Sequence, residues 1–158
     1  MRDPAQQTLP NQGFAELMTA VLAKGKPFRF QASGASMSPF IRSGDILTLA
    51  AVEGKIRCGD VLAFRQPQSG RLAVHRVVAC RKGSFLLKGD NGCQPDGWVA
   101  PENVIGRVIR VEHRGRQVRI GLGLEGILIA AWSRLGLLRP LSRAVRRLLR
   151  PVYKRFCA

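Results

Sequence analysis

The feature that most constrains the fold is a succession of short apolar segments separated by turn sequences. Downstream of residue 27, each apolar segment is followed by residues typical of tight turns, as in Ser43-Gly44-Asp45 and Lys82-Gly83-Ser84. This spacing predicts antiparallel strands joined by hairpins. The predicted strands are 28–32, 46–52, 61–64, 71–80, 84–88, 103–111 and 117–120. We therefore expect a mainly β fold, built as a coiled, barrel-like antiparallel sheet.

Helices are predicted on both sides of this β region. Five apolar residues between Phe14 and Leu22 recur at helical spacing, and Gly25 and Pro27 follow as stop signals, so residues 12–24 are expected to form one short helix. The chain is accordingly divided into a folded unit, residues 1–119 with its core at 28–111, and a helical tail, residues 120–158.

Positive charge is concentrated in the tail. The chain carries a net charge of +16, and residues 120–158 hold eight Lys and Arg against one acidic residue. Residues 120–138 are mostly apolar but broken by glycines, which favours an interfacial segment over a membrane span. Beyond Pro140, an apolar helical stripe from Leu141 to Phe156 is flanked by arginines.

Such a basic amphipathic helix predicts peripheral binding of the tail to an anionic membrane surface. The structural alternative is a helix that packs its apolar face on the β region. Nucleic acid is disfavoured as a partner, because only 6% of the residues are aromatic and could stack on bases.

Cysteine and histidine patterns predict neither a metal nor a cofactor. The four cysteines form no C-x-x-C pair, and there are only two histidines. The first 30 residues contain no apolar run of signal-peptide length, so a reduced, intracellular setting is expected. In that setting the cysteines would serve as small packing residues.

Three kinds of reactive side chain occur in suggestive contexts. Ser36 lies in a run of small residues after a strand, His75 lies inside an apolar strand, and Asp90 and Asp96 share one loop. A serine hydroxyl becomes nucleophilic when an imidazole takes its proton and a carboxylate fixes the imidazole tautomer. Either Asp90 or Asp96 could supply this carboxylate. Each residue also has a structural interpretation, as a turn serine, a core histidine or a turn aspartate.

Five sequence boxes together resemble the type I signal peptidase superfamily of serine peptidases, which includes the S24 and S26 families. The boxes are Ser36-Met37-Ser38-Pro39, Gly44-Asp45, His75-Arg76-Val77-Val78, Lys88-Gly89-Asp90-Asn91 with Asp96, and Glu102 to Val108. Their pattern is most similar to the branch of archaea and the endoplasmic reticulum, in which histidine replaces a lysine base.

The resemblance implies a role for each site residue. Ser36 would be the nucleophile and His75 the general base, Asp96 would orient His75, and Asp90 would support the site by hydrogen bonding. The activity implied is cleavage of preproteins or peptides after small residues through an acyl-enzyme. The N–H of Ser36 would be one oxyanion donor; Gly34 stands where many bacterial relatives have a serine that supplies another.

Two other functions remain open at this stage. One is a self-cleaving repressor-type peptidase, which would need a lysine base in place of His75 and usually a DNA-binding region ahead of the domain. The other is a catalytically silent β domain that binds membrane or nucleic acid through its tail. Residues 1–27 also lack the transmembrane helix that usually precedes the serine strand of the superfamily. Lys88 is expected in a loop and His113 at an exposed hairpin.

Overall fold

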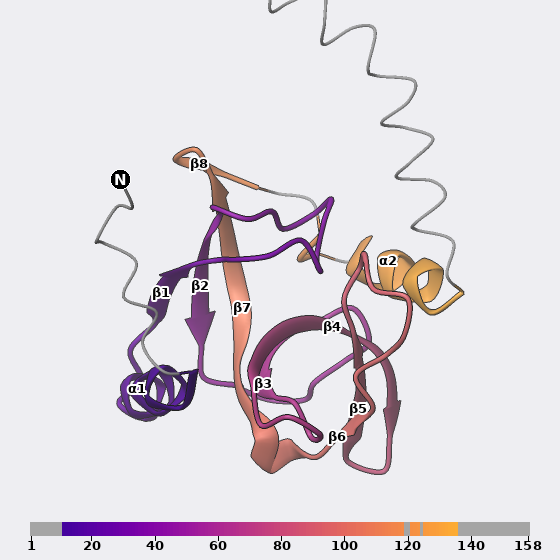
Figure 1. The fold of residues 1–158 in the computed structure, drawn as a ribbon, viewed down its shortest axis with the longest axis horizontal. Helices are drawn as coiled ribbons and strands as arrows, with labels where there is room; N and C mark the ends of the chain where they lie inside the picture. The colour runs from indigo at the N-terminus through magenta and orange to yellow at the C-terminus, as the bar shows by residue number, and fades with distance from the viewer. Residues whose placement is uncertain (1–10, 119–120, 124, 136–158) are drawn as a thin grey trace, which may run out of the picture.

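A computed structural model describes residues 11–118, 121–123 and 125–135, and it confirms the mainly β fold class (Figure 1). Its elements are α1 (Asn11–Ala23), β1 (Phe28–Gln31), β2 (Ile46–Ala50), β3 (Val61–Arg65), β4 (Leu72–Arg81), β5 (Ser84–Lys88), β6 (Trp98–Val99), a 3-10 helix (Pro101–Asn103), β7 (Val104–His113), β8 (Arg116–Gln117) and α2 (Glu125–Arg134).

All eight strands belong to one antiparallel sheet that coils without closing. The strand order is β1-β2-β7-β3-β4-β5-β6, and β8 pairs with β7. Register shifts interrupt the β2–β7, β3–β7 and β4–β5 ladders. Such bulges bend a strand and increase its twist, which lets the sheet curl around β3 as Figure 1 shows.

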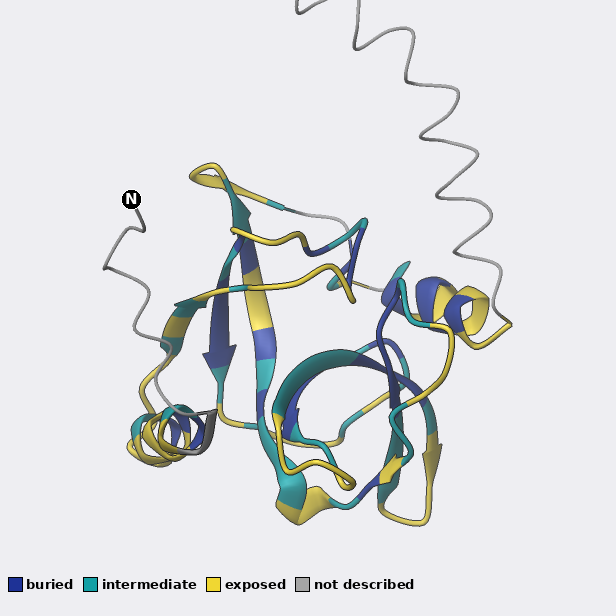
Figure 2. Cartoon of the chain, in the orientation of Figure 1, coloured by how far each residue is buried: buried dark blue, intermediate teal, exposed yellow. Residues whose placement is uncertain are grey.

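The strand β3 is buried on both faces because it lies between two cores. Leu62 and Phe64 pack into the core enclosed by β4 and β5, whereas Val61 and Ala63 face the core beneath α1. Alternate side chains of a strand point to opposite faces of the sheet. The continuous apolar run of β3 therefore reflects burial on both faces, which Figure 2 shows as dark blue.

The helix α1 covers the end of the sheet formed by β1, β2 and β7. Its Met18 and Leu22 are buried in the core, and the Phe14 ring makes edge contacts with Phe28 and Phe30. On β7, a Cβ at Gly106 would lie 2.7 Å from Leu22 Cδ1 and 2.8 Å from the Ala50 carbonyl oxygen. Glycine at this position permits the close approach of α1 to the sheet.

The helix α2 packs on β4 with one face and exposes the other. Its buried residues are Gly126, Ile129, Ala130 and Ser133. The helix comes so close to the 57–60 turn that a Cβ at Gly59 would lie 2.7 Å from the Gly126 carbonyl carbon. The first part of the predicted tail therefore packs on the sheet, and the amphipathic helix predicted beyond Pro140 lies outside the described residues.

The side chain of Glu125, the first residue of α2, binds the segment that precedes the helix. The Glu125 side chain accepts hydrogen bonds from the backbone N–H groups of Gly121 at 2.8 Å and Gly123 at 3.0 Å. Together with the N–H of Glu125 itself, these bonds hold the pKa of the carboxyl below its ordinary value of 4.5.

Two local predictions were wrong, on Lys88 and on the cysteines, and a third, on His113, was incomplete. Lys88 is not a loop residue: it ends β5 and is buried, because α2 covers it and the Ser133 carbonyl accepts a hydrogen bond from its ammonium. His113 lies in the β7–β8 hairpin as predicted, paired with Arg116, and its side chain is 39% exposed, but its Nδ1 also lies 2.5 Å from buried Asp45. Cys80 and Cys93 are exposed, and Cys58 is only half-buried, so these three cysteines are not core packing residues.

Neither described helix is long and apolar enough to cross a membrane.

Candidate active site

Ser36 lies on a tight turn between β1 and β2. The turn is held by backbone hydrogen bonds from Ser38 N–H to the Ala35 carbonyl and from the N–H groups of Phe40 and Ile41 to the Met37 carbonyl. Met37 is buried and anchors the turn in the core, whereas Ser36 is exposed. The small residues before Ser36 leave its hydroxyl accessible.

His75 is fixed from both sides of its ring. Its Nδ1 lies 2.6 Å from Asp96 Oδ2, and its ring packs against Phe64 with the centroids 6.0 Å apart. Asp96 is itself held, because its Oδ1 accepts a hydrogen bond from Gln66 Nε2 at 2.8 Å and its N–H donates to the Leu87 carbonyl. The side chains of His75 and Asp96 are only 13% and 10% exposed. The imidazole is therefore largely shielded from solvent and has one defined orientation.

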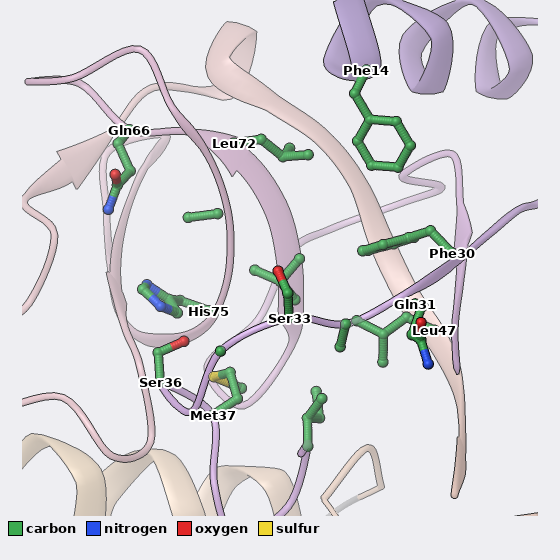
Figure 3. Close-up of a pocket in the computed structure, with 15 residues that line it drawn as sticks. Phe14, Phe30, Gln31, Ser33, Ser36, Met37, Leu47, Gln66, Leu72 and His75 are labelled. Atoms are coloured by element: carbon green, nitrogen blue, oxygen red, sulfur yellow. The ribbon is translucent and has the colours of Figure 1, made fainter. Parts of the chain in front are cut away.

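Gly89 brings Ser36 and His75 together. A Cβ on Gly89 would lie 3.1 Å from His75 Nε2, 3.2 Å from Ser36 Cβ and 2.7 Å from the Ser36 carbonyl oxygen. The serine and the free edge of the imidazole thus flank a point that only glycine leaves empty, and Figure 3 shows the two side chains next to each other. The N–H of Asn91 also donates to the Ser36 carbonyl at 2.7 Å, which ties this loop to the serine turn.

Asp90 contacts Arg76 and not His75. Both oxygens of Asp90 accept hydrogen bonds from the Arg76 guanidinium, at 2.9 and 2.8 Å, and both side chains are fully buried. Arg76 also donates to the carbonyls of Gly59 and Gly121. The structure therefore brings Ser36, His75 and Asp96 together and places Asp90 in a separate, buried ion pair behind them.

A cleft of about 550 Å³ opens beside Ser36 and His75 (Figure 3). Its walls come mainly from the Phe30–Gly34 segment and from the start of β4, and Phe14 of α1 lies at the end away from Ser36. Residues 72–75 of β4 pair with β3 on one side, but the ladder with β5 begins only at Arg76. In the described part of the chain, these residues present an unpaired strand edge to the cleft.

Three residues contribute to the site through contacts that the sequence alone does not indicate. Gln66 holds Asp96 but is an ordinary glutamine in a turn sequence, and the packing of Phe64 on His75 depends on the sheet register. Gly89 lies inside one of the sequence boxes, yet its closeness to Ser36 follows only from the coiling of the sheet. The described residues contain no cluster of three or more His, Cys, Asp or Glu side chains able to hold a metal ion.

The coiled antiparallel sheet, with a serine turn and a carboxylate-bound histidine at one cleft, has the architecture of a peptidase-type β domain. A family model described as Peptidase S24-like matches residues 2–109, and the chain belongs to this family of serine peptidases. No curated protein matches the chain significantly.

Proposed function

We propose that the protein is a serine endopeptidase resembling signal peptidase, which cleaves preproteins or peptides after small residues through an acyl-enzyme. One observation carries the proposal: Asp96 occupies Nδ1 of His75, which leaves Nε2 beside Ser36 across Gly89. A carboxylate at Nδ1 fixes the tautomer in which Nε2 can accept a proton, as a general base must.

In the proposed reaction, His75 Nε2 takes the proton of the Ser36 hydroxyl while Oγ attacks the scissile carbonyl carbon. The oxygen of the tetrahedral intermediate accepts a hydrogen bond from the Ser36 N–H, which donates to no other described residue. His75 then gives its proton to the leaving amine, and the acyl-enzyme forms. In the second half, His75 Nε2 takes a proton from water, the water oxygen attacks the ester carbon, and His75 passes that proton to the leaving Ser36 Oγ. Asp96 keeps its hydrogen bond to Nδ1 throughout.

The unpaired edge of β4 would hold the substrate. An extended peptide can add to residues 72–75 through backbone hydrogen bonds, which are independent of its sequence. Selection of side chains would then fall to the apolar walls of the cleft, among them Met37, Leu72 and Val74.

The test is cleavage of a peptide with alanine at the first and third positions before the cut, followed by mass measurement of the products. Ser36→Ala and His75→Ala should each abolish cleavage while melting at the wild-type temperature, and replacing the first-position alanine with leucine should slow it. Cleavage by the Ser36→Ala variant, or none by the intact chain, would contradict the proposal.

We further propose that α2 and the basic residues after it bind an anionic membrane surface. The outer face of α2 exposes Ile127, Leu128 and Trp132, the last at 46%, while its inner face packs on β4. Leu135, directly after the helix, is 70% exposed. Apolar side chains with a tryptophan on one face of a helix are typical of interfacial binding, and arginines follow in the sequence.

Vesicle flotation tests this second proposal without disturbing the packed face of α2. Leu128→Ser combined with Trp132→Ser should weaken flotation with phosphatidylglycerol vesicles, and a chain ending at residue 135 should weaken it further. Leu17→Ser, at an exposed leucine of α1, is the matched control and should float like wild type. Equal flotation of all these variants would exclude α2 and the tail as the binding surface.

A further inference from the structure

Two cysteines lie in contact on a surface away from the active-site cleft. Cys58 Sγ and Cys80 Sγ are 3.8 Å apart, Cys58 in the turn before β3 and Cys80 near the end of β4. Cys80 is exposed and Cys58 is half-buried, so small reagents have access to the pair. The two residues are 22 positions apart in the sequence, and folding brings them together.

The backbone sets this closeness. Gly59 N–H donates to the Val77 carbonyl, and Val77 N–H donates to the Asp60 carbonyl, both at 2.8 Å. The segment around Cys58 therefore runs beside the segment around Cys80. A disulfide has an S–S distance of about 2.05 Å, so the two sulfur atoms need to approach by less than ~2 Å. Side-chain rotation covers such a distance while the backbone hydrogen bonds stay in place.

We propose that Cys58 and Cys80 form a reversible disulfide, a redox modification site on the support of α2. The oxidant is a low-molecular-weight disulfide. One cysteine thiolate attacks it and releases one small thiol; the second cysteine then displaces the other. In sum, two protein thiols and one small disulfide give one protein disulfide and two small thiols.

The Cys80 thiol should react slowly at neutral pH. Burial, together with the hydrogen bond and charge of Cys58, raises the pKa of Cys80 to about 11. Because the thiolate is the attacking species, the rate of oxidation should increase as the pH is raised from 7 to 9.

The crosslink would act on the turn that supports α2. Gly59, next to Cys58, accepts a hydrogen bond from buried Arg76 and touches Gly126 of α2. A disulfide would tie this turn to β4 and close a loop within the chain. It would form in an oxidising compartment and remain reduced in a reducing one.

Mass analysis of the intact chain, incubated with oxidised glutathione and then alkylated and digested with trypsin, tests the proposal without any assay of activity. We expect peptides 58–65 and 77–81 to be joined by a disulfide, Cys93 to be alkylated, and the melting temperature to increase by about 5–10 °C. Cys93→Ser should behave in the same way. Cys80→Ser should show neither the linked peptides nor the increase.

Glutathione adducts on single cysteines without the 58–65/77–81 link would overturn the proposal. A 58–65/77–81 link that leaves the melting temperature of the wild type unchanged would also overturn it, because the disulfide would then not hold the turn in place. Neither outcome bears on whether Ser36 is a nucleophile.

Discussion

His75 and Arg76 are neighbours on β4, but their side chains point to opposite faces of the strand and enter different environments. Each binds one of the two aspartates of the same loop. The His75–Asp96 pair borders the cleft and is partly exposed, whereas the Arg76–Asp90 pair is fully buried beneath α2. Within the described part of the chain, Nε2 of His75 has no hydrogen-bond partner, while Arg76 binds Asp90 and two carbonyls.

This comparison shows how environment separates two similar contacts to an aspartate, the His75–Asp96 hydrogen bond and the Arg76–Asp90 ion pair. A buried pair is tolerable only when hydrogen bonds satisfy both charges, and Arg76 meets this condition. With its donors engaged by Asp90, Gly59 and Gly121, Arg76 is suited to hold β4, the Asp90 loop and α2 in place. His75 has a fixed ring and one open nitrogen, which suits it to proton transfer. Substitutions in each contact should therefore affect activity and stability differently.

The largest effect is expected from Asp96→Asn. The amide no longer fixes the imidazole tautomer, so kcat should decrease by about 10⁴-fold with little change in melting temperature. Peptide cleavage and thermal denaturation measured on the same sample check this. If Asp90→Asn, at unchanged stability, lost more activity than Asp96→Asn, the orienting role would belong to Asp90 and not to Asp96.

Next in size is Arg76→Met, which leaves the Asp90 carboxylate buried without its partner. The free energy of unfolding should fall by about 3–5 kcal/mol, as measured by urea denaturation. Arg110→Met is the matched control: it removes a cation that pairs with Glu112 at the surface, and it should cost less than about 1 kcal/mol. If both variants lost the same free energy of unfolding, burial would not explain a difference between the Arg76–Asp90 pair and the surface Arg110–Glu112 pair.

A smaller loss of activity is expected from Gly89→Ala, which places a methyl group between Ser36 and His75 Nε2. Since misplacement by about 1 Å costs on the order of 10²-fold, kcat should fall by roughly that factor. Gly13→Ala, where the added methyl group meets open space, should keep full activity. Wild-type kinetics for Gly89→Ala would show that Ser36 and His75 do not work across this point.

The smallest effect is expected at Glu125, where α2 begins. The lowered pKa of Glu125 stabilises the fold when the carboxyl is ionised, so this contribution is complete above the ordinary value of 4.5 and lost as the pH falls through the folded-state pKa. Glu125→Gln should lower the melting temperature slightly at pH 7. The difference from wild type should shrink in melts as the pH is lowered below 4.5; a constant difference at all pH values would exclude the carboxylate as its cause.

The sequence was sufficient for the fold class and the family, because alternating strands, turn residues and the ordered boxes around Ser36 and His75 are local signals. It was insufficient wherever the contact joins distant segments. Nothing in the sequence around Lys88 indicates that α2 will cover it, and nothing in residues 120–135 indicates which face will pack on β4. The roles of Ser36, His75, Asp96 and Asp90, the division at residue 119 and binding to membranes stay predictions.

An open sheet has edges, and an unpaired edge invites pairing with other chains. The edge formed by β1 is poorly suited to such pairing. This strand has only four residues, follows Lys26-Pro27 and carries Arg29, which pairs with Glu112. The opposite edge of the sheet is β6, which has only two residues. A further unpaired stretch, residues 72–75 of β4, is half-buried in the wall of the cleft. A single extended chain can reach it, but a second folded sheet cannot. The recess that would admit a peptide strand in the proposed function should therefore also keep this stretch of β4 from pairing with another copy of the protein.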